Sequence, residues 1–125
     1  MWRESDVVAF LTIAPIRPGH VLVVPVEQTD KWTDVSPDVW ARATAVSHSI
    51  GRALDNEFEC DRVGVIVAGL EVPHCHIHLV PIRTEGDLNF ANADPNASGD
   101  DLDDAAMRIR LALAAAGHSD HVSEG

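Results

Sequence analysis

Residues 72–82 have the sequence VPHCHIHLVPI, with a histidine at every second position. Neighbouring side chains of a β-strand point to opposite faces of the sheet, so residues two apart share a face. The pattern predicts a strand from 74 to about 82, with His74, His76 and His78 on one face. The residues between them are apolar, which is typical of a face that packs on the core. The histidine face therefore needs an explanation of its own.

Two further strands precede this stretch and form a predicted antiparallel hairpin over residues 6–26. The sequence there is DVVAFLTIAPIRPGHVLVVPV, in which two runs rich in Val and Ile flank a Pro-Gly turn. We expect the first strand to end at Pro15 and the second to begin at His20. Another apolar run, VGVIVA at 63–68, is short and continuous, and it predicts a buried strand.

Two helices are predicted from capping residues and apolar spacing. Ser36 and Pro37 are typical of a helix start. A stripe of apolar residues then follows at intervals of three and four: Val39, Ala43, Val46, Ile50 and Leu54. After a long polar surface loop at 83–100, a second helix is expected at about 101–116, with its own stripe. That stripe consists of Leu102, Ala105, Ile109, Leu113 and Ala116.

These elements predict a small α+β protein with an antiparallel sheet, a long central helix and a C-terminal helix. A chain of 125 residues fits one domain, which we expect to span 1–117. The remaining stretch, 118–125, has no periodicity, and we expect it to be a disordered tail in which His118 and His121 have no role.

Charge and composition exclude several classes of function. The net charge of −11 repels phosphate backbones, so a general nucleic-acid binder is not expected. No apolar segment approaches the roughly 18 residues that a membrane span needs, and no membrane partner is expected. The only cysteines, Cys60 and Cys75, cannot form a disulfide framework, and we expect Cys75 to be a small buried side chain. A cytoplasmic location is the expectation.

Three explanations fit an alternating histidine face. It can be the solvated side of an ordinary strand. Two of its histidines can bind zinc with a third ligand such as Glu71 or His20. One imidazole can instead attack phosphorus and form a covalent intermediate, while its neighbours fix its tautomer and donate to phosphate oxygens. Spacing alone does not choose between the metal site and the nucleophile.

The segment HCHIHLV at 74–80 resembles the signature of the histidine triad (HIT) family, His-x-His-x-His followed by two apolar residues. The preceding AGLEVP and the following Pro81 fit as well, and the hairpin at 6–26 is similar to the first long hairpin of the family. DLNFANADPN, at 87–96, resembles the C-terminal region of a bacterial branch of the family. The resemblance covers roughly residues 3–82.

The resemblance implies a homodimer that binds a purine nucleotide and hydrolyses or transfers nucleoside monophosphates, without a metal or other cofactor. The middle histidine, His76, is the implied nucleophile, oriented by His74, while His78 contacts the phosphate. His20 is the implied histidine beside the triad. The nucleotide-binding residues implied by the resemblance are Thr12, Ile13, Gly69, Leu70, Glu71 and His78.

The chain departs from the family pattern where the nucleotide binds. Thr12 stands where members often carry the Asp that holds the ribose, and one hydroxyl cannot bridge two ribose hydroxyls as a carboxylate can. Leu70 and Glu71 stand where members often have Gln and then Ser or Thr. The chain also begins later than family members usually do. We expect the phosphorus chemistry to be retained with altered substrate choice; the alternative is a nucleotide-binding or protein-interaction module with little turnover.

Overall fold

Five antiparallel strands form one sheet, in the spatial order β1-β2-β3-β5-β4. The structure is a computed structural model and describes residues 1–123. The strands are β1 (Trp2–Arg3), β2 (Val7–Leu11), β3 (Val21–Pro25), β4 (Arg62–Ile66) and β5 (Ile77–Ile82). The order places β3 and β5 at the centre and leaves β1 and β4 at the edges.

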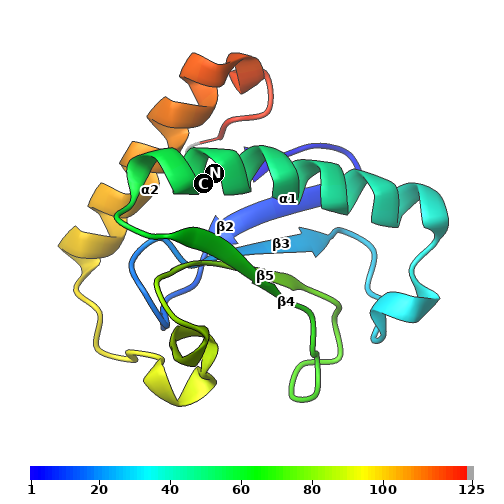
Figure 1. The fold of residues 1–125 in the computed structure, drawn as a ribbon. Helices are drawn as coiled ribbons and strands as arrows, with labels where there is room; N and C mark the ends of the chain where they lie inside the picture. The colour runs from blue at the N-terminus through cyan, green and yellow to red at the C-terminus, as the bar shows by residue number, and fades with distance from the viewer. Residues whose placement is uncertain (124–125) are drawn as a thin grey trace.

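Helices cover one face of this sheet (Figure 1). They are α1 (Pro37–Glu57), α2 (Gly99–Leu113) and the π-helical turn η4 (Ala114–His118). The short 3-10 turns are η1 (Trp32–Asp34), η2 (Glu85–Leu88) and η3 (Phe90–Asn92). Of these, η2 and η3 lie on the opposite face, because Leu88 packs against the cluster that contains Val80 and Phe90 contacts His78. The predicted α+β fold, with its antiparallel sheet, long helix and C-terminal helix, is confirmed. No helix within residues 1–123 is long and apolar enough to cross a membrane.

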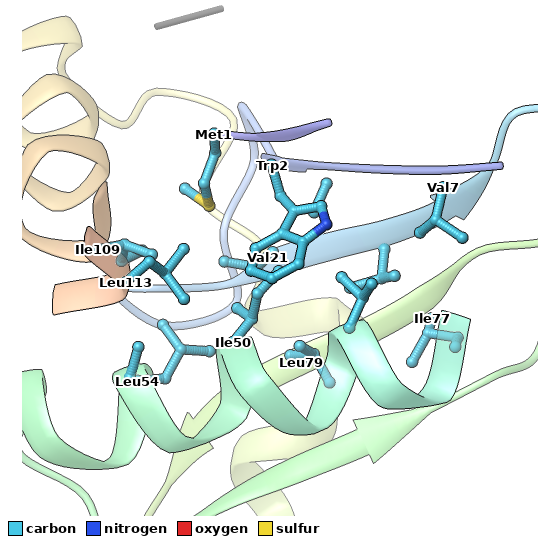
Figure 2. Packing of buried hydrophobic residues seen from close by; sticks show 14 of the residues in the cluster. Met1, Trp2, Val7, Val21, Ile50, Leu54, Ile77, Leu79, Ile109 and Leu113 are labelled. Atoms are coloured by element: carbon cyan, nitrogen blue, oxygen red, sulfur yellow. The ribbon is translucent and has the colours of Figure 1, made fainter. Parts of the chain in front are cut away.

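The core lies between α1 and the sheet. The Ser36 hydroxyl accepts a hydrogen bond from the Val39 amide and caps α1, as predicted. The residues of α1 that are buried are Ala43, Val46, Ile50, Ala53 and Leu54. They face apolar side chains of β2, β3 and β5 and of α2, and Figure 2 shows this packing. Only Val39 of the predicted stripe stays half-buried, because it lies in the first turn.

The hairpin of β2 and β3 is present, but β2 ends at Leu11, four residues earlier than expected. The chain turns at Thr12, whose hydroxyl accepts a hydrogen bond from the Ala14 amide. Pro15 and Pro18 then supply no amide hydrogen for a sheet ladder. The connection closes at Gly19, which has a φ of +88°.

The histidine strand also starts later than expected, because β5 begins at Ile77 and contains only His78 of the three histidines. Before it, the Cys75 amide donates to the Thr29 carbonyl oxygen at 2.7 Å, so this segment bonds to the loop after β3. The alternation nevertheless persists, since Cys75 and Ile77 are buried and the three histidines are half-buried. The predicted burial of Cys75 is confirmed.

The prediction of a buried strand at 63–68 is wrong. β4 is an edge strand that pairs only with β5, and Val65 is 60% exposed. A continuous apolar run does not distinguish a strand covered on both sides from one at an edge. The second helix begins at Gly99, behind a Ser98 cap, slightly earlier than predicted.

Residues 118–123 differ from the predicted disordered tail. His121 stacks on the Trp2 indole with ring centroids 5.0 Å apart, and Val122 forms an isolated bridge with Trp2. The Arg3 amide donates to the His121 carbonyl oxygen at 2.8 Å. The last two residues, 124 and 125, lie outside the described part of the chain.

Candidate active site

Three histidine rings cluster where β3 pairs with β5. His20, immediately before β3, is 2% exposed, and its Nε2 lies 2.9 Å from Nδ1 of His78. The pairing of Leu22 with His78 in the sheet register aligns the two strands at this point. On its other side His78 meets the edge of His76, with ring centroids 4.7 Å apart. The structure therefore places His20 beside the triad, as expected.

The hydrogen bonds fix the tautomers of His20 and His78. The Ile16 amide donates to His20 Nδ1 at 3.1 Å, so the neutral His20 ring carries its proton on Nε2. That proton is donated to Nδ1 of His78, which leaves the proton of His78 on Nε2. His78 thus has a free N–H donor on the side of the ring away from His20.

Burial keeps both rings neutral. Desolvation and, as a smaller cause, the neighbouring His78 together lower the pKa of His20 to about 4. Desolvation likewise lowers the pKa of His78 to about 4, with a second contribution from His76. At neutral pH this pair is a chain of uncharged donors and acceptors.

A backbone carbonyl sets the tautomer of His76. Its Nδ1 lies 2.8 Å from the carbonyl oxygen of His74, which can only accept, so Nδ1 carries the proton in the neutral ring. The lone pair is then on Nε2, where it is available for attack. The side chain of His74 is held separately, because its Nε2 donates to the Pro25 carbonyl oxygen at 2.7 Å. His74 orients His76 through its main chain, which strand spacing alone does not predict.

A pocket of about 460 Å³ opens in front of His76 and His78. Its other lining residues are Ala68, Gly69, Leu70, Glu71, Val72, Phe90 and Ala93. Gly69 has a φ of +71°, a conformation that favours glycine and turns the chain at the rim. The predicted residues Gly69, Leu70 and Glu71 are therefore at this pocket, and Leu70 is 95% exposed there.

Phe90 also lines the pocket, although no sequence motif predicts it. Its ring meets the edge of His78 with centroids 4.9 Å apart, and it belongs to η3 in the loop after β5. The signal in the sequence was a lone aromatic residue in an otherwise polar loop, which usually marks a contact with something apolar.

Thr12 and Ile13 do not line this pocket. They lie at the end of β2, where the Thr12 hydroxyl bonds to the Ala14 amide and Ile13 is 80% exposed. The predicted first strand, which was expected to end at Pro15, would include Ile13, but β2 ends at Leu11. Their assignment as nucleotide-binding residues stays a prediction.

No group of three or more His, Cys, Asp or Glu side chains within residues 1–123 is arranged to hold a metal ion. Instead, the site combines an unprotonated ring nitrogen on His76 with a neutral N–H donor on His78. Such a pair can attack an electrophilic centre and donate to an oxygen on which negative charge builds up.

Comparison with known proteins finds relatives in both sequence and structure. The family model described as HIT domain matches residues 1–85. A bis(5'-nucleosyl)-tetraphosphatase (asymmetrical) from Schizosaccharomyces pombe is 28% identical over 104 residues, which are 76% of this chain and 57% of that protein. The chain thus spans little more than half the length of this curated relative.

Two crystal structures share the fold. One is a Hit-like protein from Bartonella henselae with an unknown ligand, which is 28% identical with a TM-score of 0.76 over 89% of this chain and 83% of that one. The other is a zinc-bound histidine triad protein from Mycobacterium smegmatis, 26% identical with a TM-score of 0.75 over 94% and 85%.

Proposed function

Because the chain belongs to the HIT domain family, we propose that it is a nucleotide hydrolase or transferase with His76 as its covalent nucleophile. The observation that carries the proposal is the hydrogen bond from His76 Nδ1 to the His74 carbonyl oxygen, which leaves the Nε2 lone pair free. The neutral state of His78 supports the proposal further. A neutral His78 ring still donates its N–H, and it does not repel the positive charge that His76 carries in the covalent intermediate.

The proposed reaction has two displacements. His76 Nε2 attacks the α-phosphorus, the bond from phosphorus to the leaving group breaks, and the electron pair departs with that group. A polyphosphate leaves as an anion and needs no proton, whereas the nitrogen of a phosphoramidate takes up a proton from the solvent and leaves as ammonia. The His76 ring, now bearing the nucleotide, keeps its Nδ1 proton and its positive charge faces the His74 carbonyl oxygen. Water then attacks the same phosphorus, loses a proton to the solvent and restores the neutral ring.

The proposed substrates are derivatives of purine nucleoside monophosphates. The pocket volume of about 460 Å³ is within the range that holds a ligand of this size, and Leu70, Val72 and Phe90 give it apolar surface. The Schizosaccharomyces pombe relative, named a bis(5'-nucleosyl)-tetraphosphatase, supports a substrate in which a nucleotide is bonded to a polyphosphate. Glu71 at the rim and Thr12 in place of a carboxylate favour altered selectivity within this class.

A second candidate is a nucleotide-binding or protein-interaction module with little turnover. Glu71 favours it, because a carboxylate at the rim repels an incoming phosphate unless it turns away. In that case nucleotides bind while product release stays at background.

The experiment measures AMP release from adenosine 5′-phosphoramidate and from diadenosine tetraphosphate, with and without EDTA. Isothermal titration measures AMP binding alongside. We expect release by wild type and a loss of at least about 10³-fold in His76→Ala. The matched control is His118→Ala, which removes a histidine that contacts Trp2 and not the triad and should keep wild-type rates. AMP binding without release by wild type supports the module instead, and activity that EDTA abolishes indicates a metal enzyme.

We also propose that the protein forms a homodimer through β4. This edge strand has open backbone donors and acceptors along one side, and an identical antiparallel strand of a second copy can pair with them. Beside it lies a groove of about 550 Å³ between β4 and α1. Apolar side chains, including Trp40, Val63 and Val67, line it together with polar and charged residues such as Ser47 and Arg52. Light scattering should give the dimer mass for wild type and the monomer mass for Val65→Lys.

A further inference from the structure

A second hollow adjoins the histidine pocket. It has a volume of about 360 Å³ and is lined by Asp30, Lys31, Trp32 and Thr33 from the loop after β3. Its remaining wall is the segment 68–70, which also lines the histidine pocket. The two hollows are therefore neighbours on either side of one short backbone segment.

The loop that forms this second hollow is fastened to the histidine segment. The Gln28 side-chain amide donates to the Pro73 carbonyl oxygen at 3.0 Å, and the Cys75 amide donates to the Thr29 carbonyl oxygen at 2.7 Å. At Gly69, an added Cβ would lie only 3.9 Å from the Asp30 carbonyl oxygen, so the two backbones run close together. The position of the second hollow relative to His76 is thus set by one side-chain and one main-chain hydrogen bond and by the close approach of the two backbones.

The hollow presents exposed apolar surface to the solvent. Trp32 is 46% exposed, although its ring is held by stacking on Trp40, with centroids 5.3 Å apart and 28° between the planes. Leu70, the most exposed large apolar side chain of the chain, belongs to the shared wall. A fixed indole with open surface is suited to stacking on a flat base.

The charge of the hollow is also distinctive. Lys31 is the only lysine of a chain with a net charge of −11. None of the eight arginines, all of which lie in the described part, lines either hollow. Lys31 is consequently the cation available to a polyphosphate that extends from His76 past Leu70.

We propose that this second hollow binds the distal nucleoside of a dinucleoside polyphosphate, with its base stacked on Trp32 and its phosphates beside Lys31. The proposal rests on the function proposed above and specifies its substrate class. With diadenosine tetraphosphate, His76 Nε2 bonds to one α-phosphorus while the bond to the bridging oxygen breaks. That oxygen keeps the electron pair and departs as part of ATP, whose negative charge Lys31 offsets. Water then releases AMP from His76.

The test compares two substrates that share the adenylyl group and differ in the leaving group. For Trp32→Ala, KM for diadenosine tetraphosphate should rise roughly tenfold, as expected for the loss of one stacked base, and Trp32→Phe should restore most of it. With adenosine 5′-phosphoramidate, whose leaving group is too small to reach the second hollow, the same variants should be affected much less. Lys31→Gln should follow the same pattern.

The controls are Leu111→Ala and Arg83→Gln, which remove an exposed apolar side chain of α2 and an exposed cation at the end of β5. Equal effects of Trp32→Ala on both substrates, or an effect on neither, would overturn the proposal. If wild type cleaves neither substrate, the proposed hydrolase function fails. Binding measurements then test whether the second hollow holds the distal nucleoside. Titration should then show a weaker Kd for diadenosine tetraphosphate but not for AMP in Trp32→Ala; unchanged Kd values would overturn the subsite.

Discussion

The tautomer of His20, His78 and His76 is fixed in each case by the hydrogen-bond partner of one ring nitrogen. A backbone amide fixes His20, His20 fixes His78, and a backbone carbonyl fixes His76. The donors and acceptors at the two ends are main-chain groups, which cannot change their proton content at ordinary pH. The arrangement therefore directs one lone pair and one N–H toward the pocket without any charged side chain.

The buried histidine pair makes stability depend on pH. In the unfolded chain a histidine has a pKa near 6.5, whereas burial lowers the pKa of His20 and His78 to about 4. Between those values the unfolded state binds protons that the folded state excludes, so stability is complete above about pH 6.5 and falls toward pH 4. For His20 alone the loss from pH 7 to pH 5 should be about 2 kcal/mol.

Urea unfolding at pH 7, 6 and 5 measures this loss. In His20→Asn, which has no titrating ring at that position, the fall between pH 7 and pH 5 should be clearly shallower than in wild type. His48→Ala removes an exposed histidine and should leave the wild-type slope in place. Equal slopes in His20→Asn and wild type would contradict the assignment of the neutral state to burial.

The hairpin and α1 show which elements could be predicted from local sequence. A helix is specified by contacts within a few residues, so Ser36, Pro37 and the apolar spacing were enough to predict α1. The end of β2 was missed because it depends on the Thr12 turn and on pairing with β3. Phe90 was missed because its contact with His78 arises from how the loop after β5 folds back.

Gly19 is the residue on which the hairpin turn depends. Its φ of +88° is strained for any side chain, and an added Cβ would lie 3.1 Å from the Phe58 ring. Gly19→Ala should therefore lower the free energy of unfolding by about 1–3 kcal/mol. Gly51→Ala is the matched control: this glycine lies in α1 with nothing within 4 Å of an added Cβ, so the same substitution should stabilise by up to about 1 kcal/mol. Chemical denaturation of both variants checks the opposite signs.

Over the whole molecule, the first residue of the chain meets Ser123, the last residue that the structure describes. The strand β1 and the segment after η4 thus lie side by side. The Ser123 amide donates to the Met1 carbonyl oxygen at 3.0 Å, and His118 and His121 both pack against the buried Trp2 ring. Periodicity within 118–125 could not predict this contact, because the partner of the segment is more than a hundred residues away. The segment covers the edge strand β1, which would otherwise expose Trp2.

Substituting His118 and His121, whose rings pack on Trp2, should therefore destabilise the fold while leaving the histidine site intact. His118→Ala with His121→Ala should lower the free energy of unfolding by about 1–3 kcal/mol, the sum expected for two aromatic contacts. Trp2 is nearly inaccessible in the folded protein, so its added hydration should shift tryptophan emission to longer wavelength. His48→Ala, which removes an exposed histidine of α1, should change neither quantity.

Because His118 and His121 contact β1 and not the triad, kcat for AMP release should stay at the wild-type value at temperatures where the double variant is folded. If the double variant is as stable as His48→Ala, the C-terminal segment does not stabilise the fold.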